Sequence, residues 1–182
     1  MGWIILAVGA VVVLWAVAVY NGLVQLKVRA DGSWSDIDVQ LKRRHDLIPN
    51  VVETVKGYAA HEQKVFQAVT EARTRAMQAG TPDARGQAEN GLSGALKSLF
   101  AVAENYPQLR ASENFQGLQN SLTQIEEAIQ NARRYYNAVV RDYNTKLSVI
   151  PDRFIAALAG FQLREFFQPD SAEDRQNVKV SF

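Results

Sequence analysis

The stretch WIILAVGAVVVLWAVAVY, from Trp3 to Tyr20, decides the fold of this 182-residue chain. It carries no charged side chain. At about 1.5 Å of rise per residue, a helix of this length spans roughly 27 Å, close to the hydrocarbon thickness of a bilayer. Lipid offers no partners to backbone polar groups, so the stretch must satisfy its own as a helix. It therefore predicts a transmembrane helix, with Trp3, Trp15 and Tyr20 as interfacial anchors.

Two other interpretations of this stretch are a buried core helix and a cleaved signal peptide. A chain of this size rarely hides a helix that is apolar on all sides over such a length. Ala16-Val17-Ala18 matches the small-x-small cleavage pattern, but no Lys or Arg precedes the stretch. It is also longer than the apolar region of about 7–15 residues in a signal peptide. We expect it to stay on the chain as an anchor.

The charges that flank the stretch predict its orientation. Lys27 and Arg29 follow it, and Lys42, Arg43 and Arg44 come next, whereas no Lys or Arg precedes it. Because an excess of Lys and Arg marks the cytoplasmic side, we expect a short N-terminus outside and the C-terminal domain in the cytoplasm.

Composition limits the function classes. The chain has 20 Lys plus Arg against 19 Asp plus Glu, so it offers no strong basic field for nucleic acid. It has no cysteine, which excludes disulfides, thiolate chemistry, cysteine metal sites and lipid acylation of a cysteine.

Apolar side chains recur at three-four spacing along the rest of the chain, as in helices packed in a bundle. One run extends from Trp34 to Ala76; Asp31-Gly32-Ser33 is the weak point before it, and Pro49 should kink rather than end the helix. A second helix starts at Thr81-Pro82, as N-cap and first helical residue, and stops before Pro107.

The clearest run follows Ser112, a candidate cap for a third helix. Its apolar positions are Phe115, Leu118, Leu122, Ile125, Ile129, Ala132, Tyr136, Val139 and Tyr143. Four charged residues should lie off this face in water: Glu126, Glu127, Arg133 and Arg134. A last helix, from about Pro151 to Phe167, would supply core residues Phe154, Leu158, Phe161 and Phe166.

These runs predict an all-α fold, in which an N-terminal transmembrane helix precedes an up-down antiparallel, four-helix-type bundle of long helices. The predicted divisions are an anchor at residues 1–26, a bundle at 27–167 and a polar tail at 168–182. In the tail, Val178, Val180 and Phe182 alternate as in a short extended segment.

Catalytic and metal-binding patterns are lacking. A di-metal bundle needs Glu three residues before His, but Lys42 precedes His45 and Tyr58 precedes His61 at that spacing. HEQKV, which starts at His61, lacks the second His of a zinc protease motif. No glycine-rich phosphate loop is present, so we expect no catalytic residue, no metal and no cofactor, and histidines that face solvent.

The most charged stretch is WSDIDVQLKRRHD, which begins at Trp34. It fits a solvated helix face with pairs such as Asp38–Lys42, or a surface that docks a partner or anionic head groups. Arg44 and Glu62 interrupt the apolar run, so each must pair with another helix or sit at an edge, and the edge is the simpler prediction. The candidate docking surface comprises Asp36, Asp38, Lys42, Arg43, Arg44 and Asp46.

Several longer blocks resemble the LemA family over nearly the whole chain. They are YNGLVQLK, WSDIDVQLKRRHDLIPNVVETVKGYAAHE, AENYPQLRASENFQGLQ, IQNARRYYNAVVRDYN, GFQLREFF and the closing VKVSF. The resemblance implies a single-pass protein of the bacterial inner membrane whose remaining part is a long-helix bundle. The family has no established enzymatic activity, so the resemblance supplies no catalytic residues.

We therefore predict a membrane-anchored helical scaffold or interaction protein that is not an enzyme. Its expected partners are the bilayer, through Trp3–Tyr20, an unidentified protein, and a second copy through an open helical face, with no nucleic acid. The alternative is a membrane-remodelling protein or a sensor of anionic lipid, which would bind anionic vesicles in a salt-sensitive way.

Overall fold

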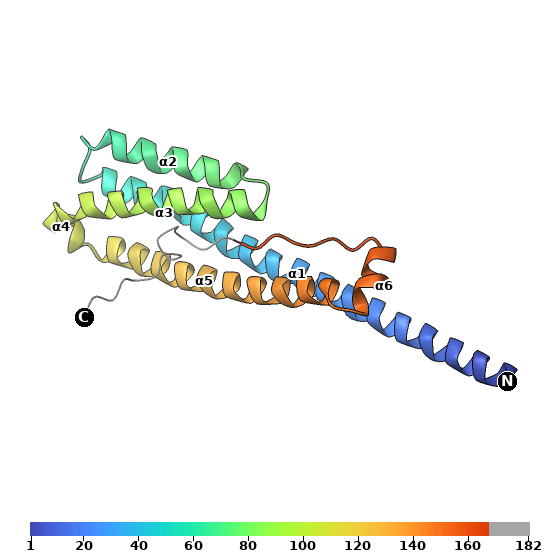
Figure 1. The fold of residues 1–182 in the computed structure, drawn as a ribbon. Coiled ribbons are helices and arrows are strands. Elements are labelled where there is room, and N and C mark those ends of the chain that lie inside the picture. Colours follow the sequence, from blue (N-terminus) through green and yellow to red (C-terminus); the bar gives the residue numbers. More distant parts are fainter. Residues whose placement is uncertain (168–182) are drawn as a thin grey trace, which may run out of the picture. The chain divides into compact units, whose positions relative to one another are not determined.

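The structure, a computed structural model, describes residues 1–167 (Figure 1). The predicted polar tail at 168–182, with its alternating Val178, Val180 and Phe182, lies outside the described residues. Every regular element in the described part is a helix, which confirms the all-α prediction. The helices are α1 (Gly2–Lys56), α2 (Gln63–Gln78), α3 (Pro82–Glu104), α4 (Pro107–Arg110), α5 (Glu113–Ser148) and α6 (Asp152–Leu158).

The chain forms two compact units. The anchor unit comprises Met1–Ile37 and Ala132–Glu165, and the described part of the bundle unit comprises Asp38–Asn131 together with Phe166 and Phe167. Helices α1 and α5 contribute to both units, whereas α2, α3 and α4 belong to the bundle unit and α6 to the anchor unit.

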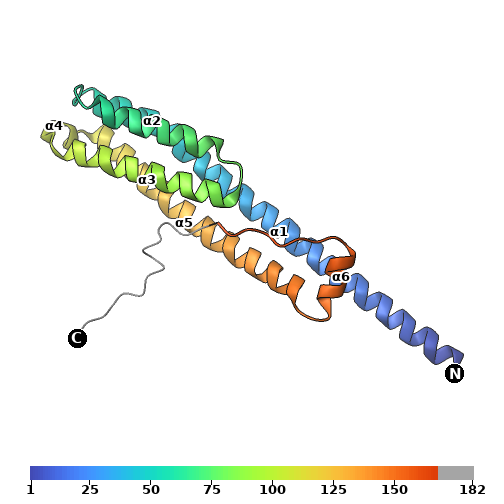
Figure 2. The ribbon, with the colours of Figure 1, turned by 45° about the horizontal axis from the view of Figure 1, so that its top comes forward.

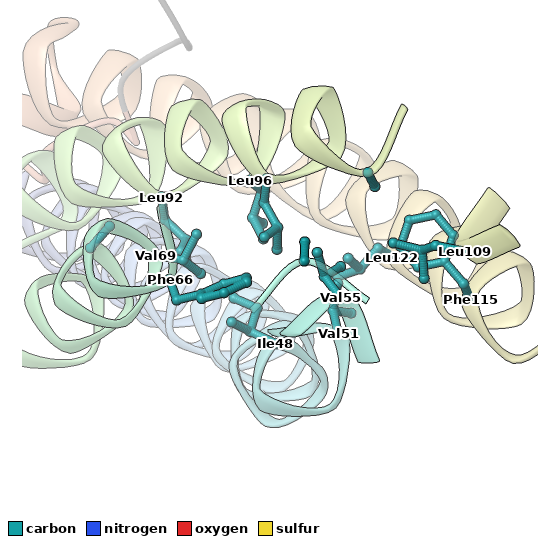
Figure 3. Close-up of a cluster of buried hydrophobic side chains, with 14 of the residues drawn as sticks. Ile48, Val51, Val55, Phe66, Val69, Leu92, Leu96, Leu109, Phe115 and Leu122 are labelled. Atoms are coloured by element: carbon teal, nitrogen blue, oxygen red, sulfur yellow. The ribbon is translucent and has the colours of Figure 1, made fainter. Parts of the chain in front are cut away.

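The bundle unit is built around one apolar core between the second part of α1, α2, α3 and the first part of α5 (Figure 3). Short connections at 57–62 and 79–81 join α1 to α2 and α2 to α3. Three-four spacing places the core side chains on one face of each helix. Those labelled in Figure 3 are Ile48, Val51, Val55, Phe66, Val69, Leu92, Leu96, Leu109, Phe115 and Leu122.

The anchor unit packs α1 against the second part of α5 and against α6 (Figure 2). The rings of Trp34 and Tyr136 lie 5.3 Å apart between centroids. After α6 the chain continues without regular structure and is held to α5, since Asn144 exchanges two hydrogen bonds with the backbone of Arg164. The cluster that joins the three helices contains Val19, Leu23, Tyr143, Leu147 and Ala156.

Within the described residues, α1 is the one helix long and apolar enough to cross a membrane. Its most apolar 18-residue window has a mean hydropathy of 2.6, and 6% of that window is buried. A core helix of a soluble protein would be mostly buried, so the structure contradicts the core-helix interpretation and supports a membrane location.

Several predicted helix ends are confirmed. The Thr81 side chain accepts a hydrogen bond from the Ala84 N–H at 3.2 Å and caps α3, which starts at Pro82. Helix α5 begins directly after Ser112, whose carbonyl accepts from the Gln116 N–H. Pro49 lies inside α1 and does not end it.

Two predictions about α1 are wrong. The run from Trp34 to Ala76 is two helices, because α1 ends at Lys56 and the chain turns before Gln63. Gly57 follows the last helical residue, as glycine commonly does at helix ends. Conversely, Asp31-Gly32-Ser33 causes no break: the residues are helical, and the buried Ser33 hydroxyl donates to the Ala30 carbonyl one turn earlier.

The last helix is shorter than predicted, since α6 ends at Leu158 rather than near Phe167. Gly160 has a φ of 72°, which is accessible to glycine at little cost. Its N–H bonds to the Ala157 carbonyl and the Phe161 N–H to that of Ala156, a Schellman ending. Of the predicted core residues, Phe154, Leu158 and Phe166 are exposed, and Phe161 packs partly buried against the anchor unit's cluster.

The predicted placement of the charges on α5 is also partly wrong. Arg133 is buried, because it lies four residues after Ile129 and three before Tyr136 on the same helix face. Glu126 is half-buried rather than in water.

Candidate functional site: a buried ion-pair network beside a groove

Three ionisable side chains are buried together in the bundle unit. Arg44 and His45 come from α1 and Glu89 from α3, and their exposed fractions are 4%, 8% and 4%. Arg44 lies three residues after Leu41 and four before Ile48, so the helix turns it towards the core. Buried charges of this kind are stable only when they are paired and hydrogen-bonded.

Glu89 holds both residues of α1, one with each carboxylate oxygen. Its Oε2 lies 3.1 Å from Nη1 of Arg44, and its Oε1 lies 2.7 Å from Nε2 of His45. Nη2 of Arg44 donates to the Ser93 hydroxyl at 2.6 Å and lies 3.3 Å from Oε2 of Glu126 on α5. The network therefore links α1, α3 and α5 through charge-assisted contacts.

Proline at position 49 brings α2 into the same network. In a regular helix the His45 carbonyl would accept from the N–H four residues later, but that residue is Pro49, which has none. Nε of Arg73, on α2, donates to the His45 carbonyl at 2.8 Å instead. The guanidinium thus replaces the missing backbone donor, as a buried carbonyl requires.

The contacts of the network are those of a structural element that fixes the helices of the bundle unit to one another. Over residues 1–167 no buried side-chain nitrogen or oxygen lacks a hydrogen-bond partner. The same residues hold no group of three or more His, Asp or Glu side chains arranged to bind a metal ion. Arg44 and Glu89 are committed to each other and to their neighbours, so the arrangement fixes helices rather than activating a nucleophile.

A groove of about 740 Å³ lies beside the network, between α3 and α5. Arg44 and Glu126 reach it from the network, and Leu96, Phe100 and Leu122 provide apolar surface. The rest of its lining is mainly polar: Asn90, Ser93, Lys97, Gln119, Thr123, Glu127 and Gln130. The groove therefore offers apolar and polar surface side by side.

The predicted docking surface is only partly a surface. Arg44 is buried, and Asp38 pairs with Arg85 of α3 rather than with Lys42. Lys42 lies 3.8 Å from Asp46 in an exposed pair. The members of the predicted set that are exposed on α1 are Asp36, Lys42, Arg43 and Asp46. Whether they dock a partner stays a prediction.

Two predictions about single residues are wrong, and one is confirmed. Arg44 does not extend its head into water from an edge but pairs in the core, and His45 is buried rather than solvent-facing. His61 is exposed as predicted, and Glu62 is half-buried immediately before α2. The sequence does not predict the burial of Glu89, because an acidic side chain within a helix ordinarily faces water.

Comparison with known proteins matches most of the chain to one family. The model of the LemA family matches residues 33–182, which is most of the chain. Two magnetosome proteins of Paramagnetospirillum magneticum, MamQ 1 and MamQ 2, are each 26% identical to it over 181 aligned positions. Magnetosome protein MamQ of Magnetospirillum gryphiswaldense is 25% identical over the same length.

Each of these alignments covers 85% of this chain and 66% of the relative, so the chain spans slightly less than two thirds of the curated relatives that it matches. Neither the family description nor the relatives' names refer to a reaction. The exposed apolar part of α1 supports association with a membrane. On the extent of the family match, the chain belongs to the LemA family.

Proposed function

We propose that this chain is a membrane-anchored scaffold that holds a protein partner at the surface of the bacterial inner membrane. The observation that supports the proposal most strongly is that α1 is one continuous helix from the apolar segment to the bundle core. One helix begins with an exposed apolar segment at Trp3–Tyr20 and continues to Ile48, Val51 and Val55 in the bundle core. The anchor segment and part of the bundle core therefore lie on the same helix, α1, and no flexible linker separates them.

The anchor crosses the membrane once, with its N-terminus outside and the bundle unit in the cytoplasm. Lys27 and Arg29 are exposed on α1 just beyond the apolar segment. Cations in this position favour the cytoplasmic side. A single-pass arrangement leaves the bundle free to meet soluble partners.

The partner binds to exposed charges on α1 within the bundle unit. Arg44, His45 and Glu89 are occupied by one another, so recognition falls on Lys42, Arg43 and Asp46, which lie in water. Two cations and one acid within five residues select a partner surface that places acidic groups opposite Lys42 and Arg43 and a cation opposite Asp46, since like charges placed opposite each other are repelled.

The test is capture of partners from native membranes. Full-length protein carrying a photo-cross-linking residue at Val39, which is exposed on α1 next to these charges, is irradiated in cells and purified. We expect a specific protein adduct that is lost in the double variant K42E/R43E. The matched control is K64E/R75E, which reverses two exposed cations on α2 of the same unit and should keep the adduct.

Three outcomes would contradict the proposal in different ways. No adduct at Val39 would exclude a partner at this face. Equal loss in both double variants would mean that general charge, and not this face, governs capture. An adduct with a second copy alone would turn the scaffold into a self-associating one, in which this chain is its own partner.

A further inference from the structure

Large apolar side chains are exposed where α5 turns into α6. Ile150, Phe154 and Leu158 have exposed fractions of 73%, 66% and 87%. Phe154 and Leu158 are four residues apart and share the outer face of α6, whereas Ile155 and Ala156 pack inward against the anchor unit's cluster. The helix is therefore apolar on two faces, and among residues 1–167 only the inner one is covered by protein.

This apolar tip lies beside the end of the predicted transmembrane segment. The inner face of α6 joins the cluster that contains Val19 and Leu23 of α1. The ring of Tyr20 lies 5.8 Å from that of Phe161, just after α6. Figures 1 and 2 both show α6 beside α1. The exposed residues thus accompany α1 at the point where it leaves the hydrocarbon.

The depth can be worked out from α1. A bilayer is about 40–45 Å thick with head groups and about 30 Å without them, which leaves roughly 5–7 Å of head-group region on each side. At 1.5 Å per residue, that region covers about three to five helical residues beyond Tyr20. Helix α6 packs at the level of Val19 to Leu23. Its exposed side chains therefore reach the boundary between head groups and acyl chains.

Cations occupy the same level. The Lys146 side chain lies directly over Gly22, because a Cβ placed on that glycine would meet its Nζ at 2.5 Å. Arg153 is exposed on α6 between Asp152 and Phe154. Apolar groups next to cations, at the level of lipid phosphates, are the composition of an interfacial membrane-binding element.

We propose that the α5–α6 tip, comprising Ile150, Phe154 and Leu158, inserts into the leaflet from which α1 emerges, with Lys146 and Arg153 facing the lipid phosphates. The occupant of this apolar face is the bilayer itself, because the face continues the surface that α1 already offers to lipid. The proposal rests on the membrane-spanning role of α1, and it adds a second contact that holds the anchor unit against the leaflet.

The lack of cysteine in the chain allows a direct test. Three single-cysteine variants of the full-length protein, L158C, V12C and Y135C, are labelled with an environment-sensitive fluorophore. They are reconstituted into vesicles of phosphatidylcholine and phosphatidylglycerol that contain a lipid with a quencher at the top of its acyl chain. All three positions are exposed, so labelling should not disturb packing.

Position 12 reports on the anchor, and position 135 is the matched control on the same unit. Tyr135 is an exposed aromatic side chain on α5, roughly 20 Å along the helix from Ser148. We expect the lipid-borne quencher to reduce fluorescence severalfold more at positions 158 and 12 than at 135. A water-soluble quencher should show the reverse order.

The outcomes separate this proposal from the one on which it rests. Quenching by lipid at 12 but not at 158 would overturn the interfacial tip and leave the anchor standing. Quenching at neither position would overturn the anchor. A label at 158 that is shielded from the water-soluble quencher and untouched by the lipid one would show that protein covers the tip, and it would overturn lipid contact.

Discussion

At the scale of single residues, the sequence showed that Arg44 posed a problem but not how the fold solves it. A cation on an apolar helix face needs an acid from another helix, and the chain has 19 Asp and Glu to choose from. Glu89 lies three residues before Leu92, on the buried face of α3 that also holds Leu96 and Leu99, so it was a candidate partner by spacing alone. The hydrogen bond from Arg73 to the His45 carbonyl depends on tertiary placement, which spacing does not reveal.

Replacing Glu89 by leucine should destabilise the bundle unit strongly. The variant E89L leaves Arg44 and His45 buried without their shared carboxylate, and removing one partner of a buried ion pair typically costs about 3–5 kcal/mol. Glu126 still faces Arg44, so the loss should fall at the lower end. Urea denaturation of the full-length protein in detergent micelles, followed by circular dichroism, measures it.

The matched control is E104L, which removes an exposed carboxylate at the end of the same helix. It should change the free energy of unfolding by no more than about 0.5 kcal/mol. Similar losses in the two variants would show that Glu89 acts through its charge alone and not through its buried contacts.

Two tyrosines of the anchor unit should make it sensitive to alkaline pH. Burial raises the pKa of Tyr136 and of Tyr143 above the ordinary value of 10.0, against the opposing effect of the Arg164 guanidinium. Because both pKa values are raised on folding, their contribution to stability is complete below pH 10 and is lost as pH rises through the folded-state values. The urea midpoint should therefore fall above about pH 10.

The variant Y136F removes one of these groups, together with the hydrogen bond from its hydroxyl to the Glu165 carbonyl. It should be less stable at neutral pH and lose less stability between neutral and alkaline pH. Y135F, at an exposed position, should follow the parent protein. Identical pH profiles for parent and Y136F would contradict the assignment.

At the scale of the elements, hydrophobic spacing predicted most helices and failed at two of their ends. It identified the apolar segment of α1, the cap of α3 and the start of α5, where local chemistry determines the outcome. It missed the turn at Gly57–Glu62 because the three-four pattern happens to stay in phase across the turn. It placed the end of α6 too late because apolar residues continue after Gly160, although that glycine ends the helix.

Glycine substitutions at two sites should have opposite effects on stability. G160A forces an L-residue into the left-handed region at a φ of 72°, which costs roughly 1–2 kcal/mol. G91A lies inside α3 with nothing within 4 Å of the added Cβ, and should stabilise by about 0.5–1 kcal/mol. Thermal unfolding of the two variants in micelles tests the pair, and a stabilising G160A would contradict the Schellman ending.

At the scale of the whole molecule, the all-α class and the LemA family were predicted from the sequence and are confirmed. Long helices with an apolar start leave few alternatives, and blocks of residues identify a family more reliably than single motifs. The exposed tip of α6 was not predicted, since the sequence suggested that Phe154 and Leu158 were core residues. Apolar side chains look the same in a sequence whether protein or lipid covers them.

Because the chain has no cysteine of its own, its orientation in the membrane can be measured from the reactivity of single introduced cysteines. A cysteine at exposed Arg43 should be protected in intact cells from a thiol reagent that cannot cross the inner membrane, and should react after permeabilisation. A cysteine at Gly2 should react in intact cells. The reverse pattern would place the bundle unit outside and contradict the positive-inside argument.

Glu89 contacts two adjacent residues of α1, Arg44 and His45, and this affects how the bundle assembles. If α3 slid along α1 by one turn, about 5.4 Å, the apolar faces would still meet, but Arg44 and His45 would both lose their acceptor. Apolar contacts tolerate such a shift, whereas a buried cation that loses its acidic partner destabilises the shifted arrangement. The network of Arg44, His45 and Glu89 therefore selects the correct alignment of α1 and α3, because misaligned bundles lose these contacts. It does so even where it adds little to the free energy of unfolding of the correctly aligned bundle.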